Sequence, residues 1–297
     1  MPTEQMDIRT DDGAVINIIF SNDDTQPAKG AVIVIHGFGE HSGSYNELIE
    51  KLVAAGYACA IFNQRGHGAL NLGVGNQGNK TKNAGSRQKD MRGIIPSYQC
   101  FLDDIDAVSA AVKQHAPDMP VALYGHSMGG NIVINYLLKQ NHADYSCAVL
   151  ESPWLGLYKK VNPLVTVLAN ILGRLSPKIA IINKLSPNDI TSDSAKADFI
   201  RNDHLYHNRI SMRMITGIID GCKYALENAS KLTIPVYLAS AGNDRIVSNR
   251  AIEEFTGAAG SNVTLKVYDS CHAIHNDTER EALYQDVISY LDEYLKK

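Results

Sequence analysis

A strand-like and a helix-like segment flank Tyr124-Gly125-His126-Ser127-Met128-Gly129-Gly130. The aliphatic run 120–123 before it is typical of a buried strand, and the apolar periodicity of 131–138 after it is typical of a helix. A Gly-x-Ser-x-Gly pentapeptide between a strand and a helix predicts a nucleophile elbow, a sharp turn that exposes the serine. Ser127 is therefore the candidate nucleophile.

The glycines fit such an elbow because its strand and helix pass closely and leave no room for side chains beside the serine. Gly125 and Gly129 occupy the two flanking positions. The turn also directs the helix N-terminus and the Met128 N–H group at the reacting oxygen, where they favour negative charge. A glycine-rich turn without chemistry is the alternative interpretation, because Gly and Ser are common in turns.

A serine hydroxyl needs a base, and the usual base is a histidine that a buried carboxylate orients. In α/β-hydrolases the carboxylate and the histidine follow the serine in that order. Asp244 follows the apolar run 234–239, and His272 follows the strand-like run 263–268. Both are thus expected at the carboxyl ends of strands, where open α/β sheets place functional groups. Asp244 and His272 complete the predicted triad, with an ordinary loop aspartate as the alternative at position 244.

Two histidines compete for the role of base, because His275 lies on the same predicted loop as His272. We favour His272. His275 is closer to the start of the last helix, which Asn276 or Asp277 could cap. A solvated or supporting position is therefore the expectation for His275.

The oxyanion of a tetrahedral intermediate needs a second donor besides Met128. The β-rich run 31–35 ends in a glycine-containing loop, 36–42, at the position where α/β-hydrolases carry their first oxyanion loop. The main-chain N–H of Phe38 is the predicted donor. Simple turn glycines at 37 and 39 are the alternative.

Four motifs of the chain occur together in one known family. They are the run His36-Gly37-Phe38-Gly39-Glu40-His41-Ser42-Gly43-Ser44-Tyr45, Arg65-Gly66-His67-Gly68, the elbow at 125–130 and Ser152-Pro153-Trp154-Leu155. With these motifs the chain resembles the monoglyceride lipase and lysophospholipase family of α/β-hydrolases over nearly its whole length. The resemblance implies the same triad and oxyanion donors. It also implies that Glu40 lines the polar end of the pocket, where a glycerol-like head would sit; an exposed loop carboxylate is the alternative.

The chain departs from that family at two places. Asn63 stands where many relatives have an aspartate, two residues before the Arg-Gly-His-Gly motif, and we expect no catalytic consequence. The segment 69–92 is longer than usual and rich in Gly, Asn and Lys, which is typical of a mobile surface loop. Its basic side chains could meet an anionic head group or membrane surface, although charged runs are usually just solvated. They are Lys80, Lys82, Arg87, Lys89 and Arg92.

Composition narrows the class of protein. The 297 residues are 44% hydrophobic and 20% charged, enough for one large α/β domain, and the net charge of −4 gives no basic field for nucleic acid. No signal pattern and no apolar run of bilayer length occurs. The five cysteines are odd in number and lack metal-ligand spacing, which favours reduced thiols in a cytoplasmic protein. No metal or organic cofactor is expected.

Periodicity predicts the organisation of the chain. Two opening strands, 7–10 and 14–20, form a hairpin, and from residue 31 strands alternate with amphipathic helices, which predicts a mostly parallel sheet with helices on both faces. The alternation stops after Ser152, and the segment to Arg209 contains several prolines and no convincing strand. We predict an α/β-hydrolase core of residues 1–152 and 210–297, with residues 153–209 inserted as a helical cap over the carboxyl edge of the sheet.

The predicted cap carries two apolar groups. One helical stripe comprises Val161, Leu164, Val165, Leu168, Ile171, Leu172 and Leu175, and a second cluster spans 179–182. Packing on the core domain is the expectation for most of these residues. Alternatively, part of this surface lines an acyl-chain channel and makes transient contact with a membrane surface.

These patterns predict a serine hydrolase that cleaves carboxylic esters of lipids, monoacylglycerol or lysophospholipid, through an acyl-enzyme on Ser127. A short-chain or aromatic-acid esterase would share every catalytic residue. A peptidase acting on N-terminal residues is disfavoured, because no acidic cluster for a substrate amine is evident. A ligand sensor that retains the fold without catalysis is the alternative from another class. No oligomeric state is predicted.

Overall fold

The computed structural model describes residues 2–69, 91–139, 144–159, 179–183 and 185–295. The apolar stripe between 161 and 175 and most of the loop 69–92 lie outside these residues. Their predicted roles therefore stay predictions.

Within the described residues, eight strands form one sheet in the order β1-β2-β4-β3-β5-β6-β9-β10. The antiparallel pairs β1·β2 and β2·β4 lie at one edge, and the other neighbours are parallel. This confirms the predicted α/β-hydrolase architecture. The strands are β1 Thr3–Arg9, β2 Val15–Ser21, β3 Ala31–Ile35, β4 Ala58–Phe62, β5 Val121–His126, β6 Cys147–Glu151, β9 Val236–Ala241 and β10 Val263–Tyr268.

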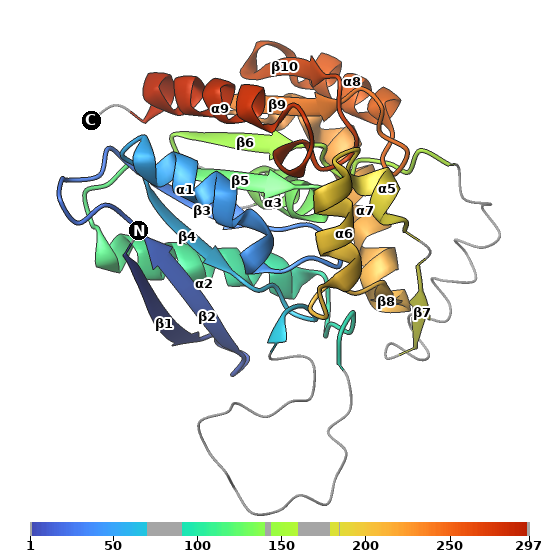
Figure 1. The fold of residues 1–297 in the computed structure, drawn as a ribbon, viewed down its shortest axis with the longest axis horizontal. Helices are drawn as coiled ribbons and strands as arrows, with labels where there is room; N and C mark the ends of the chain where they lie inside the picture. Colours follow the sequence, from blue (N-terminus) through green and yellow to red (C-terminus); the bar gives the residue numbers. More distant parts are fainter. Residues whose placement is uncertain (1, 70–90, 140–143, 160–178, 184, 296–297) are drawn as a thin grey trace, which may run out of the picture.

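Helices cover both faces of the sheet (Figure 1). Residues of α1 Asn46–Ala54 and α9 Arg280–Tyr294 share one hydrophobic cluster. Residues of α2 Gln99–His115, α3 Met128–Lys139, α7 Met212–Asn228 and α8 Asn249–Ala259 share the other. Short 3₁₀ turns lie at Ser42–Tyr45, Ala229–Lys231, Gly260–Asn262 and Ile274–Asn276.

Strand β3 shows why the central strands are apolar throughout. Val32 and Val34 belong to the cluster under α1 and α9, whereas Ile33 and Ile35 belong to the cluster on the opposite face. A strand that is buried on both faces has no polar side to alternate with. The continuous run 31–35 follows directly from this position.

The elements after β6 gather at the carboxyl end of the central strands (Figure 1). They are β7 Ala180–Ile182, α5 Pro187–Ile190, α6 Ser194–Asn202 and β8 Arg209–Ser211. The expectation that the segment 153–209 holds no strand is wrong, because β7 pairs antiparallel with β8. Strands of three residues are too short to show a two-residue period.

The second apolar cluster of the predicted cap is not packed on the core as expected. Ile179, Ile181 and Ile182 are 45%, 47% and 67% exposed. Side chains of β7 therefore present hydrophobic surface. No helix of the described segments combines the length and the apolar character that a bilayer crossing requires.

Candidate active site

Ser127 lies on the turn between β5 and α3. Its φ of 52° is one that residues other than glycine rarely adopt. The glycines beside it are required by close contacts. A Cβ atom at Gly129 would lie 2.1 Å from the Ile35 carbonyl oxygen, and one at Gly125 would lie 2.7 Å from the Gly129 carbonyl oxygen. The backbone thus has the geometry of a nucleophile elbow.

Hydrogen bonds to the last residue of β6 and to the chain just after it hold this turn in place. The Ser127 N–H donates to the Glu151 carbonyl oxygen at 2.9 Å, and the Trp154 N–H donates to the Ser127 carbonyl oxygen at 2.9 Å. Ser152 lies between these two contacts and also has a positive φ, 41°. Such dihedrals persist only where surrounding contacts impose them.

The three residues of the predicted triad lie in one hydrogen-bonded chain. His272 Nε2 is 2.8 Å from Ser127 Oγ, and His272 Nδ1 is 2.6 Å from Asp244 Oδ2. The other oxygen of Asp244 accepts main-chain N–H groups of Ile246 and Val247 at 2.7 and 2.9 Å. If Nδ1 carries the hydrogen, Nε2 is left to accept the serine proton.

The charges around His272 favour its protonated form. Burial lowers the pKa of His272, but the Asp244 carboxylate together with those of Glu40 and Glu151 outweighs burial, and the pKa lies above its ordinary value. Burial likewise raises the pKa of Asp244, and the attraction of His272 with the two main-chain donors brings it below its ordinary value. The pair is therefore suited to carry an imidazolium beside a carboxylate.

His275 points to a different partner. Its Nδ1 lies 2.9 Å from Glu151 Oε2, and its ring stacks on Tyr45 with 4.5 Å between the ring centres. Of the two positions expected for His275, the solvated one is wrong, because the residue is 1% exposed, and the supporting one remains. The structure brings His272, and not His275, to the Ser127 hydroxyl.

The loop after β3 carries the Phe38 N–H group. Within the described part of the chain, the main-chain N–H groups of Phe38 and Met128 have no hydrogen-bond partner. Gly39 has a φ of 78°, and its carbonyl oxygen accepts the His207 N–H at 2.9 Å. Asn63, which stands where many relatives have an aspartate, supports the end of this loop. Its side-chain oxygen accepts the Ser42 N–H at 2.8 Å.

Glu40 occupies a buried cluster. It is 4% exposed, so the alternative of an exposed loop carboxylate is wrong. Its Oε2 atom lies 2.6 Å from the Tyr45 hydroxyl and 3.2 Å from His126 Nδ1. His126, Tyr45 and Glu151 could not be predicted to form one network, because no local pattern links residues so far apart along the chain.

Among the described residues, one group has the composition of a metal site. Ligand atoms of Glu40, His126 and His275 lie within 4.8 Å of one another. These side chains also hydrogen-bond to Tyr45, to Glu151 and to Asn276. The proximity of the three residues is thus explained by hydrogen bonding alone.

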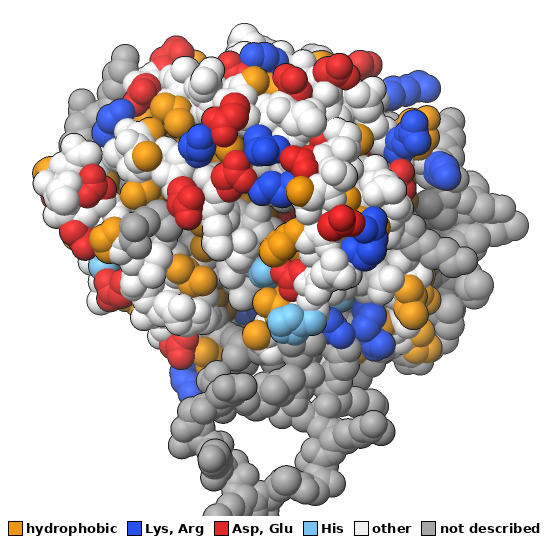
Figure 2. Space-filling model, viewed as in Figure 1, with side chains coloured by type: hydrophobic (Ala, Val, Ile, Leu, Met, Phe, Trp, Pro, Cys, Tyr) orange, Lys and Arg blue, Asp and Glu red, His pale blue; other side chains and the backbone are white. Residues whose placement is uncertain are grey.

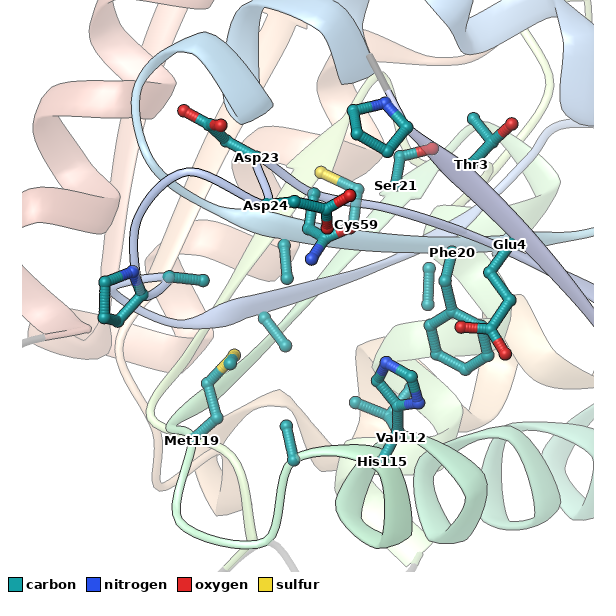
Figure 3. A pocket seen from close by; sticks show the side chains of 18 of the residues that line it. Thr3, Glu4, Phe20, Ser21, Asp23, Asp24, Cys59, Val112, His115 and Met119 are labelled. Atoms are coloured by element: carbon teal, nitrogen blue, oxygen red, sulfur yellow. The ribbon is translucent and has the colours of Figure 1, made fainter.

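A hollow of about 680 Å³ lies elsewhere, and Figure 3 shows the side chains around it. Its lining includes Ala31 and Ala58, the first residues of β3 and β4. The triad follows the carboxyl ends of β5, β9 and β10, so the hollow lies at the opposite end of the parallel strands. All five cysteines are free thiols, and only Cys271 among them is partly exposed.

Residues 26–279 match the model of a protein family described as "Serine aminopeptidase, S33". Phospholipase YtpA of Bacillus subtilis is 28% identical over 89% of this chain and 95% of its own length. Monoacylglycerol lipase of Mycolicibacterium smegmatis is 26% identical over 92% of this chain and 91% of its own. An abhydrolase domain-containing protein of Dictyostelium discoideum is 30% identical, and the chain spans 26% of its length.

A solved structure agrees in fold over the whole chain. A soluble variant of monoglyceride lipase from Saccharomyces cerevisiae, in complex with a substrate analog, superposes with a TM-score of 0.84 at 25% identity, covering 100% of this chain and 97% of that one. A carboxyl esterase from Bacillus coagulans superposes with a TM-score of 0.77 at 24% identity, covering 99% of each chain. The chain belongs to the α/β-hydrolase family described as serine aminopeptidase, S33, and is a serine hydrolase of the lipase and esterase group.

Proposed function

We propose that this chain hydrolyses carboxylic esters of lipids, monoacylglycerol or lysophospholipid, through an acyl-enzyme on Ser127. The observation that carries the proposal is the hydrogen-bonded chain Ser127–His272–Asp244, with distances of 2.8 and 2.6 Å. Relatives that match most of this chain are named as phospholipase and monoacylglycerol lipase, which supports a lipid ester as substrate.

The proposed reaction has two halves. His272 takes the Ser127 proton as the hydroxyl oxygen attacks the ester carbonyl, and the N–H groups of Phe38 and Met128 stabilise the oxyanion. His272 then protonates the departing alcohol. In the second half water attacks the acyl-enzyme, its proton passes to His272, and Ser127 leaves with that proton while the fatty acid is released. Asp244 keeps the ring oriented and stabilises its charged form throughout.

We also propose that residues 153–209 act as the cap through which a lipid substrate enters. Exposed apolar side chains on its described part support transient contact with a lipid surface, namely those of β7 and Phe199, which is 53% exposed. No partner protein is invoked. The proposed place of action is the cytoplasm, because the cysteines are free thiols.

Three other functions are alternatives to lipid hydrolysis. A short-chain or aromatic-acid esterase would use the same triad and differ in the cap and pocket. The family description names an aminopeptidase, which needs carboxylates for the substrate amine. Glu40 and Glu151, buried close to the triad, already accept hydrogen bonds from Tyr45 and His275, which disfavours that role. A non-catalytic sensor would not need a histidine that is placed to accept the Ser127 proton.

Labelling with a fluorophosphonate probe tests the nucleophile. We expect the wild-type chain to be labelled and Ser127→Ala to remain unlabelled; labelling that survives the substitution contradicts the assignment. His272→Ala should abolish ester turnover, whereas His275→Ala should lower stability and keep measurable turnover. The reverse pattern would assign the base to His275.

Turnover of a p-nitrophenyl ester series from acetate to palmitate, beside monoacylglycerol, lysophosphatidylcholine and an aminoacyl p-nitroanilide, tests the substrate class. A maximum at eight carbons or longer with cleavage of either lipid supports the proposal. A maximum at acetate without lipid cleavage favours the small-ester alternative, and cleavage of the anilide favours the peptidase.

A further inference from the structure

One oxygen atom of Glu40 faces donors from three parts of the fold. Its Oε2 accepts the Gly37 N–H at 2.8 Å and the Tyr45 hydroxyl at 2.6 Å, and it lies 3.2 Å from His126 Nδ1. Gly37 follows β3, Tyr45 precedes α1, and His126 ends β5. A single carboxylate therefore joins the oxyanion loop to the strand that carries the nucleophile.

The Gly37 position has no space for a side chain because these groups fill it. A Cβ atom there would lie 2.8 Å from Glu40 Oε2 and 2.9 Å from His126 Nδ1. Such distances are far inside van der Waals contact. The glycine thus admits the carboxylate and the imidazole directly against the main chain of the loop.

Hydrogen bonds fix the two peptide groups on either side of the Gly37 Cα atom. Its N–H donates to Glu40, and its carbonyl oxygen lies 2.8 Å from His36 Nδ1. His36 is fixed in turn, since its Nε2 accepts the Gln64 N–H at 3.0 Å. The Gly37 carbonyl and the Phe38 N–H belong to one planar peptide, so the His36 bond sets the direction of the Phe38 N–H. The Glu40 bond fixes the preceding peptide, which is joined to it at the Gly37 Cα atom.

The same carboxylate reaches the second proposed donor through His126. His126 directly precedes Ser127, and its ring centre lies 5.0 Å from that of His272. The Tyr45 hydroxyl closes the network, because it also accepts the Gly37 N–H at 3.2 Å and lies 3.0 Å from His126 Nδ1. A shift of Glu40 would therefore move both sides of the proposed oxyanion hole.

Glu40 remains a carboxylate in this buried place. Burial raises its pKa, but the opposing attraction of His126 and the Tyr45 hydroxyl holds the pKa well below its usual range. Charged acceptors make shorter and stronger hydrogen bonds than neutral ones. The charged oxygen thus strengthens the hydrogen bond that the Gly37 N–H donates.

We propose that Glu40 is a positioning residue of the oxyanion hole, which aligns the Phe38 N–H through Gly37 and the elbow through His126. The proposal rests on the acyl-enzyme mechanism proposed above. It differs from the predicted contact of Glu40 with a substrate head group, since Glu40 acts here through the main chain of the oxyanion loop.

Three variants test the proposal with a soluble p-nitrophenyl ester and a trifluoromethyl ketone inhibitor, whose adduct with Ser127 carries an oxyanion. Glu40→Ala should lower kcat roughly a hundredfold, as expected for a displaced oxyanion donor, while KM changes by less than about threefold. The ketone should bind weaker by a similar factor. Glu40→Gln keeps an acceptor for Gly37 and should stay within about tenfold of wild type. Tyr45→Phe removes one arm of the network and should give an intermediate loss of kcat.

Asp104→Ala is the matched control, because Asp104 is a buried carboxylate (1% exposed) on α2 that accepts hydrogen bonds from Arg65. It should lose thermal stability and keep kcat. The proposal is overturned if Glu40→Ala keeps kcat within threefold, if ketone affinity does not fall with kcat, or if Glu40→Gln is as impaired as Glu40→Ala. If Glu40→Ala does not fold, Tyr45→Phe with unchanged kcat overturns it. A wild-type chain that cleaves no ester and takes no fluorophosphonate label refutes the proposed function instead.

Discussion

Ser127 has a φ of 52°, a region in which an L residue with a Cβ atom is strained by about 1–2 kcal/mol. Ser127→Ala and Ser127→Gly both remove the hydroxyl, but only the second also removes the Cβ atom. We expect Ser127→Gly to be more stable than Ser127→Ala by about 1 kcal/mol in thermal unfolding. Equal melting temperatures would show that the turn is unstrained.

The acid limb of the pH profile should report on His272. Only the neutral imidazole can accept the serine proton, so turnover falls as the pH drops through the pKa of His272, which lies above its ordinary value. Asp244→Asn removes the carboxylate that raises this pKa, and the limb should move to lower pH. The same change should lower kcat roughly ten-thousandfold, because the ring loses the required tautomer. If the acid limb does not move in Asp244→Asn, Asp244 does not raise the pKa of the base.

The residues that could be predicted are those with a local signature. Ser127 follows from its flanking glycines, and Asp244 and His272 follow from their order and from the strands before them. The environment of Glu40 could not be predicted in this way, because His126 is 86 residues further along the chain. Only the pairing of β3 with β5 brings these two side chains together.

At the scale of elements, the contact between α3 and β3 depends on Gly129. A Cβ atom there would meet the Ile35 carbonyl oxygen at 2.1 Å, and main-chain atoms cannot move aside cheaply. We expect Gly129→Ala to prevent folding or to lower the melting temperature severely. Gly257→Ala is the control, because a Cβ atom there in α8 has no neighbour within 4 Å. It should stabilise the protein by up to about 1 kcal/mol, since Ala favours helices. A harmless Gly129→Ala would disprove the close packing.

Element prediction succeeded both at the buried strand β3 and at the edge strand β10, of which only the first and last residues are buried. The predicted strands 31–35 and 263–268 coincide with β3 and β10. Prediction failed at β7, whose isoleucines are apolar in sequence yet exposed in the fold. Hydrophobicity alone does not say whether a side chain meets the core, a substrate or a lipid surface.

At the scale of the molecule, charge and hydrophobic surface are distributed differently. The face in Figure 2 shows both signs of charge interspersed, consistent with a net charge of −4, and hydrophobic side chains near the end where Figure 1 shows β7. A scattered charge pattern gives no long-range attraction for a polyanion. The exposed isoleucines are the more specific feature of the described surface.

Ile182→Ser tests whether this hydrophobic surface meets lipid. We expect turnover of monoacylglycerol held in vesicles to fall severalfold, because less apolar area is transferred from water, while turnover of a soluble p-nitrophenyl ester is unchanged. Val267→Ser is the matched control, since Val267 on β10 is 60% exposed and Ile182 is 67% exposed. Equal losses for both variants, or no loss for Ile182→Ser, would contradict contact through β7.

The strand order of the sheet also has a consequence for synthesis of the chain. His272 follows β10, the edge strand next to β9, and lies 145 residues after Ser127. Ribosomes add roughly 5–20 residues per second, so about 7–30 seconds separate the translation of the two residues. Throughout that interval the nascent chain carries a serine without its base. Hydrolytic activity therefore begins only after the last strand has left the ribosome and paired.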